Sequence, residues 1–146
     1  AYKLWTRGED GALAAYPPAE IERGDLSAFA LELALWGAQA EELAFVTPPH
    51  AGRLQEAKAL LNMLDALDAQ GRITPHGRKL AKLPLHPRLA HMVAQGGRTA
   101  ATLAAILAER DPLRGAPLDL SHRIRAVAGE RVAGEVHHAT LARIKQ

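Results

Sequence analysis

The stretch Gln70–Leu89, QGRITPHGRKLAKLPLHPRL, constrains the fold most, because several changes of backbone structure follow one another within it. Gln70 and Gly71 indicate a turn, since glycine accepts the positive φ that other residues resist. The next residues, Arg72–Thr74, are predicted to form a very short strand. Thr74 followed by Pro75 predicts the start of a helix, with proline at the first helical position, where its missing N–H costs nothing.

Two further prolines divide the rest of this stretch. Leu80 and Leu83 give the helix that starts at Pro75 an apolar face, and Pro84 ends it. Pro87 then begins another helix. The order helix, turn, short strand, helix, helix resembles the second half of a winged helix that runs directly into a helical bundle.

Hydrophobic periodicity extends this mainly helical prediction to both sides. Gly37 is expected to end the first strong helix and the pair Gly96-Gly97 to break a later one. Leu61 and Leu64 are expected to be fully buried, so that Leu64→Ala costs about 2–5 kcal/mol. The predicted helices span residues 20–36, 53–67, 75–83, 87–94, 99–109, 119–128 and 135–146. In the helices 99–109 and 119–128, the expected core face includes Leu103, Ile106, Leu107, Leu120, Ile124 and Val127.

The first residues read differently. Ala1–Thr6 alternates apolar and polar residues, which predicts a strand, and a loop is expected from Arg7 to Pro18. Because this strand has no preceding partner, we expect the sequence to be a piece of a longer protein.

Charge is distributed unevenly along a chain whose net charge is only +2. Residues 1–66 carry five Lys/Arg and ten Asp/Glu, whereas residues 67–146 carry thirteen and six. A basic second half suits nucleic acid, and it equally suits a solvated bundle surface whose arginines pair with neighbours. The chain has no cysteine, which excludes disulfides and thiolate zinc sites and fits a cytoplasmic protein. It contains no apolar run long enough for a membrane span.

The search for catalytic chemistry is negative. Gly96-Gly97 lacks the following Lys-Ser/Thr of a phosphate loop, and neither serine lies in a nucleophile elbow. His86 and His91 are five residues apart across Pro87, a spacing that does not place two imidazoles on one helix face. The sequence therefore predicts no catalytic residue, no cofactor-binding residue and no metal ligand.

Four blocks of the sequence resemble DEAH-box ATP-dependent helicases, most closely the bacterial HrpB type. AYKLWT resembles the last strand of the second RecA-like domain, and PPAEIERGDLSAFALELALWG resembles the first helix of the winged-helix domain. The longest block runs from LAFVTPPH to LPLHPRLAHMV and resembles the family stretch with its patterns F-x-x-P-P, G-x-L-T-P-x-G and P-L-x-P-R-L-A, with Ile73 in place of the leucine of the second pattern. RTAATLAAILAERDPLRG resembles the opening of the helicase-associated, or ratchet, domain. Residues 116–146 match only in order and helical character.

The resemblance implies a mainly α fold, a winged helix followed by a ratchet-type helical bundle. The implied parts are a leftover strand and linker of a RecA-like domain (1–15), the winged-helix domain (16–86) and the start of the bundle (87–146). The phosphate loop, the DEAH tetrad and the arginine motif of the family are absent from this sequence. ATP and Mg²⁺ are therefore expected only in the full-length parent, and the chain itself is expected not to hydrolyse ATP.

The implied role is accessory. The chain would brace the RecA-like motor domains of the same protein and line the channel for single-stranded nucleic acid, which it would bind weakly by itself. It is expected to be a monomer without membrane contact. Two alternatives stay open: a stand-alone winged-helix DNA-binding protein, and a purely structural adaptor.

Five residues are candidate nucleic-acid contacts. Arg98 and Thr99 open a predicted helix whose free N–H groups suit a phosphate, although a plain N-cap by Thr99 explains them equally well. Arg88 either reaches the channel or joins the two domains structurally. Arg123 and Arg125 are expected to point outward, on opposite sides of the helix 119–128, so that at most one of them faces the channel.

Overall fold

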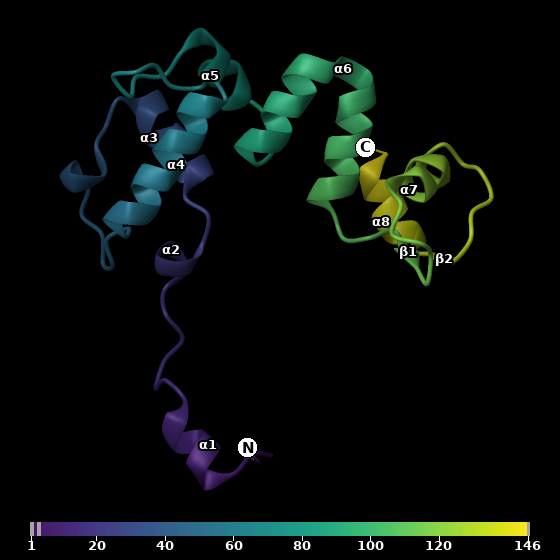
Figure 1. Cartoon of the computed structure of the whole chain (residues 1–146), viewed down its shortest axis with the longest axis horizontal. Helices are drawn as coiled ribbons and strands as arrows, with labels where there is room; N and C mark the ends of the chain where they lie inside the picture. Colours follow the sequence, from purple (N-terminus) through teal and green to yellow (C-terminus); the bar gives the residue numbers. More distant parts are fainter. Residues whose placement is uncertain (1, 3, 146) are drawn as a thin grey trace.

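A computed structural model describes residue 2 and residues 4–145, which form two lobes joined by one long helix (Figure 1). The first lobe contains α2 (Glu20–Arg23), α3 (Ser27–Trp36), α4 (Ala51–Met63) and α5 (Pro75–Leu80). A single 3-10 turn, Ala40–Glu42, lies between α3 and α4. The mainly helical fold predicted from the sequence is confirmed.

The second lobe is a small bundle around the end of α6 (Pro87–Ala108). It contains α7 (Leu120–Val127) and α8 (His138–Ile144), together with two short strands. These strands, β1 (Leu113–Arg114) and β2 (Glu135–Val136), pair antiparallel. The prediction of an unbroken helix over 135–146 is wrong at its start, because Glu135 and Val136 pair with β1 and the helix begins only at His138; Gln146 lies outside the described residues.

The start of the chain also differs from the prediction. Residues 2 and 4–6 lie in no strand, and the predicted loop contains α1 (Arg7–Ala12), which projects away from both lobes (Figure 1). Thr6 and Glu9 explain this helix, because the Thr6 hydroxyl accepts from the Glu9 N–H at 3.2 Å and the Glu9 carboxylate accepts from the Thr6 N–H at 2.7 Å. This reciprocal capping box stabilises a helix N-terminus. Residues 1 and 3 of the predicted strand lie outside the described residues.

The first predicted helix, 20–36, is interrupted. The chain leaves helical geometry at Gly24, and the carboxylate of Asp25 accepts from the N–H of Ser27 at 2.7 Å, which starts α3 anew. The expected end of this helix is confirmed, because Gly37 has a left-handed backbone (φ 76°) and its N–H donates to the Leu33 carbonyl at 2.9 Å. Extended backbone at Gly24 and the local hydrogen bond between Asp25 and Ser27 therefore interrupt the helix, although the apolar periodicity continues across Gly24.

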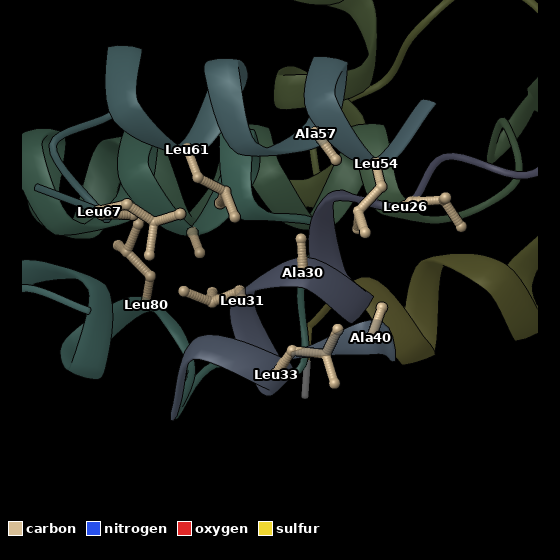
Figure 2. Packing of buried hydrophobic residues seen from close by; sticks show 12 residues of the cluster. Leu26, Ala30, Leu31, Leu33, Ala40, Leu54, Ala57, Leu61, Leu67 and Leu80 are labelled. Atoms are coloured by element: carbon tan, nitrogen blue, oxygen red, sulfur yellow. The ribbon is translucent and has the colours of Figure 1, made fainter. Parts of the chain in front are cut away.

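The core of the first lobe lies between α3 and α4 and is closed by α5 (Figure 2). Leu61, with 0% of its surface exposed, and Leu80, with 1%, are its most buried leucines. The prediction for Leu64 is wrong: this residue is half-buried, because the chain turns at Asp65 (φ 54°) directly after α4. The other members of this core are Leu26, Ala30, Leu31, Leu33, Ala40, Leu54, Ala57, Ala66, Leu67 and Ala90.

The stretch after α4 folds largely as its turn and cap signals indicate. Thr74 caps α5, since its hydroxyl accepts from the Gly77 N–H at 2.9 Å, and Pro75 occupies the first helical turn. Gly77 is buried against the Ala66 carbonyl oxygen, where any Cβ would clash, so the family glycine has a packing reason. The predicted strand 72–74 is reduced to one antiparallel bridge, between Leu67 and Ile73.

The long helix α6 is kinked where the glycine pair was expected to break it. Gly97 has φ 59° and ψ −140°, a conformation outside the helical region, and helical geometry resumes after it. The first half of α6 contacts α5 and α3, whereas α7 and α8 also pack on α6 in the second lobe. The kink therefore lies within the single helix that runs between the two lobes (Figure 1).

Candidate nucleic-acid interface

Arg98 and Thr99 lie directly after the kink in α6, and both are exposed. Within residues 4–145, neither side chain has a hydrogen-bond or ion-pair partner, so Thr99 makes no N-cap bond to the following turn. The Arg98 guanidinium is consequently free to meet a phosphate. Arg98 and Thr99 stay predicted contacts of a strand.

Arg88 lies in the first turn of α6, where it lines a pocket of about 320 Å³ between α3 and α4. The same pocket is lined by Arg53, Asp25 and Glu56, so both signs of charge are present. Arg53 is partly committed, since its Nη1 donates to the Arg23 carbonyl at 2.8 Å. The Arg88 side chain is exposed and has no partner among the described residues, which leaves both of its predicted roles open.

Arg123 is the clearest correction to the predicted interface. It was expected to point outward, and only 4% of its surface is exposed. Its Nη2 and Nε donate to the two carboxylate oxygens of Asp111 at 2.6 and 3.2 Å, and its Nη1 donates to the carbonyls of Pro117 and Asp119. The hydrogen bond to Asp111 raises the pKa of Arg123 and lowers that of Asp111. A guanidinium so fully engaged is not available to a phosphate.

The prediction for Arg123 fails because α7 buries the opposite face from the one predicted. Apolar spacing predicted that Leu120, Ile124 and Val127 face inward, yet Leu120 and Ile124 are each 39% exposed and Val127 is half-buried. Arg123 and Ala126 face the interior instead. The carboxylate of Asp111 and two loop carbonyls satisfy the guanidinium, which makes burial of a charge possible. On α6, Leu107 is likewise 51% exposed, against the prediction of a core position.

Arg125 lies on the outer side of α7, as predicted. Its Nε donates to the Glu130 carboxylate at 2.7 Å, and about half of each side chain is exposed. An exposed ion pair of this kind contributes little to stability and exchanges readily. Arg125 is therefore accessible to a strand, in competition with Glu130.

A model of the winged-helix part of the helicase-associated domain (HA2) matches residues 59–85, the segment from the end of α4 through α5. The chain is also similar to the crystal structures of HrpB from Escherichia coli. One, described as a DEAH/RHA helicase, superposes over 97% of this chain with a TM-score of 0.73 and 28% sequence identity. The other, described as a DExH-box NTPase, superposes over 95% of this chain with a TM-score of 0.64 and 30% sequence identity. The resemblance to DEAH-box helicases is confirmed.

Curated helicases from several organisms align with the same region. The human probable ATP-dependent RNA helicase DHX35 is 29% identical over 98% of this chain, and the DExH-box ATP-dependent RNA helicase DExH3 of Arabidopsis thaliana is 32% identical over 76%. The chain spans 21% and 10% of these two proteins, and 17% of the longer HrpB match. The chain therefore corresponds to a helicase-associated region within these much longer proteins.

The helicase-associated region contains no grouping of three or more His, Asp or Glu side chains suited to a metal ion, as far as residues 2 and 4–145 are concerned. Its closest histidine pair is His76 and His91, whose Nε2 and Nδ1 lie 2.9 Å apart. Over the same residues, no helix is long and apolar enough to cross a membrane.

Two arginines of the helicase-associated region are not among the five predicted contacts. Arg110 and Arg114 are exposed, and together they line a pocket of about 290 Å³ against β2 and the start of α8. Neither arginine lies in a binding motif that the sequence reveals. The segment that completes the pocket, 135–140, was predicted to be plain helix, so no sequence signal brought the two parts together.

Proposed function

We propose that the chain is an accessory region of an ATP-dependent DEAH-box helicase, which braces the motor domains and lines the channel for single-stranded nucleic acid. The observation that carries this proposal is the similarity to HrpB over 97% of the chain at a TM-score of 0.73. The predicted parts, 1–15, 16–86 and 87–146, stay as proposed. In this proposal, ATP and Mg²⁺ are bound by motor domains of the full-length protein outside this chain. The protein is proposed to be cytoplasmic.

The strand is proposed to be RNA, because the curated relatives are named RNA helicases. Exposed arginines of the second half of the chain supply the contacts. Arg98, next to Thr99 and after the kink, is the principal one, and Arg88 and Arg125 are secondary. Arg123 is left out because Asp111 holds it in the interior.

Strand binding by the isolated chain tests this proposal. A channel wall touches only one side of a strand, so binding should be weak and indifferent to sequence. With two or three phosphate contacts, the logarithmic salt slope for a single strand is expected to be about −1.4 to −2. The measurement is fluorescence anisotropy of a labelled RNA oligonucleotide over a salt series, repeated with DNA of the same sequence.

Arg98→Glu should weaken binding and flatten the slope by about 0.7, the contribution of one phosphate contact. Arg7→Glu is the matched control, since it makes the same charge change in α1, which lies away from the bundle (Figure 1). If the two variants bind alike, the proposed face of α6 is wrong. Specific retardation of a duplex would instead favour the stand-alone DNA-binding alternative.

A further inference from the structure

The pocket between the β1–β2 pair and α8 is distinct from the predicted contacts on α6. It is lined by Arg110 and Arg114 from one side and by Glu135, His137 and Thr140 from the other. The two sides are held together by the strand register Arg114↔Glu135 and by the His137 N–H, which donates to the Pro112 carbonyl at 2.8 Å. The pocket is thus built by tertiary pairing and not by one flexible loop.

The acidic side chains beside the two arginines are committed elsewhere. Glu109 accepts from Arg143 of α8 at 3.0 and 3.1 Å, and this bond lowers the pKa of Glu109. Asp111 is occupied by Arg123 and by the Leu113 N–H. Within residues 4–145, neither Arg110 nor Arg114 makes a side-chain hydrogen bond or ion pair, although the charge of Arg110 also helps to lower the pKa of Glu109. The donor groups of both guanidiniums are therefore left for a ligand.

His137 adds a polar side chain whose tautomer is set by its neighbours. The backbone N–H of Thr140 donates to His137 Nδ1 at 3.3 Å, and the Thr140 hydroxyl lies 2.8 Å from the same nitrogen. That hydroxyl accepts from Arg143 Nη2 at 3.2 Å, so its own proton is directed to Nδ1. Because Nδ1 accepts, the neutral ring carries its proton on Nε2, where it is a donor.

We propose that this pocket binds a phosphate group of a single-stranded nucleic acid, with Arg110 and Arg114 as its ligands and His137 as a further donor. The inference deepens the proposed function and rests on it for the choice of nucleic acid over other anions. Guanidinium groups suit phosphate oxygens because each presents a planar fork of donors. A volume of about 290 Å³ holds a phosphate with several water molecules, which occupy about 30 Å³ each.

Glu135 is the one carboxylate of the pocket that has no partner among the described residues. It lies opposite Arg114 in the strand pair, so its negative charge opposes an incoming phosphate. Removing this charge should therefore tighten binding. A gain of affinity is a useful readout, since loss of folding cannot produce it.

The test compares three variants of the full chain by anisotropy with a labelled single-stranded RNA over a salt series. The double variant Arg110→Ala/Arg114→Ala should bind about two- to fivefold more weakly per arginine, the range of exposed ion pairs, and its slope should flatten by about 0.7. Glu135→Gln should bind about two- to fivefold more tightly. Arg131→Ala, an exposed arginine of the same lobe outside the pocket, is the control and should change binding least.

The outcomes separate the pocket from the proposed function. If the unsubstituted chain binds RNA and the double variant binds it as tightly as Arg131→Ala does, the proposed phosphate binding by the pocket is wrong, while the proposed accessory role stands. Absence of tightening in Glu135→Gln would also overturn the pocket. No binding by the unsubstituted chain at low salt would overturn both. Melting temperatures of all variants verify that each one is folded.

Discussion

Arg123 is the residue whose observed role differs most from its predicted one. A charged side chain that is only 4% exposed requires a partner, and Asp111 provides a bidentate one. The carbonyls of Pro117 and Asp119 both accept from Nη1, so this arginine ties the loop before α7 to the helix itself. Arg123 therefore has a structural role, although the sequence predicted it as an exposed contact for nucleic acid.

Arg123→Ala should lower the melting temperature by about 5–10 °C, because it leaves the Asp111 carboxylate and two carbonyls without their donor. Differential scanning calorimetry checks this. Arg125→Ala is the matched control: it removes an exposed ion pair with Glu130 on the same helix and should change the melting temperature by little. Equal effects of the two substitutions would contradict a structural role specific to Arg123.

At the scale of elements, α4 and α6 each combine a correct prediction with a local departure. The predicted burial of Leu61 in α4 is confirmed, but the helix ends at Met63, four residues before the predicted end at Leu67. Beyond it the N–H groups of Ala66 and Leu67 both donate to the Leu61 carbonyl, at 2.8 and 3.3 Å. The turn they form brings Ala66 and Leu67 into the core, whereas Leu64, which was predicted to be fully buried, is only half-buried.

Leu61→Ala should destabilise the chain by about 2–5 kcal/mol, through lost transfer free energy and a cavity. Leu64→Ala should cost less, about 1–2 kcal/mol, because that side chain is only half-buried. Urea unfolding of the two variants provides the comparison. A larger loss for Leu64→Ala would show that the end of α4 is packed differently from the structure described above.

Gly97 determines the direction of the second half of α6. Its φ of 59° and ψ of −140° are accessible to glycine and unfavourable for residues with a Cβ. Gly97→Ala should therefore destabilise the chain by about 1–3 kcal/mol. Gly11→Ala is the control, since an added Cβ there meets no atom within 4 Å and the φ is not positive. Unchanged stability in Gly97→Ala, measured by urea unfolding, would mean that the kink is not required.

At the scale of the whole molecule, the chain is two small lobes joined by α6, with α1 projecting from the first (Figure 1). The first lobe has an apolar core of twelve buried residues, whereas the buried residues of the second include the charged Arg123 and the polar Thr140 as well as Ala104 and Ile106. Two small lobes joined by one helix are compatible with the proposed role, which is to brace motor domains.

The purified chain should hydrolyse no ATP, with or without single-stranded RNA, because the sequence lacks the phosphate loop and the DEAH tetrad that bind triphosphate and Mg²⁺. A coupled phosphate-release assay measures this, with the Arg98→Glu variant as the control for contaminating helicase. RNA-stimulated turnover that persists through repeated purification would overturn the accessory role.

Local signals account for what the sequence by itself determined. The Thr74-Pro75 start of α5, the end of α3 at Gly37 and the break at Gly97 each depend on residues within a few positions of one another. The winged-helix family model matches residues 59–85, a segment that includes the Thr74-Pro75 start of α5. Interactions over so short a range can be read from spacing and residue type, because few alternatives compete with them.

Only the tertiary structure decided the second lobe. The burial of Arg123 depends on Asp111, twelve residues earlier, and the pairing of β1 with β2 joins segments about twenty residues apart. The pocket of Arg110 and Arg114 exists only once that pairing brings His137 beside them. Neither the burial nor the pairing leaves a local pattern, because an arginine pairs or stays exposed according to which carboxylate the fold brings to it.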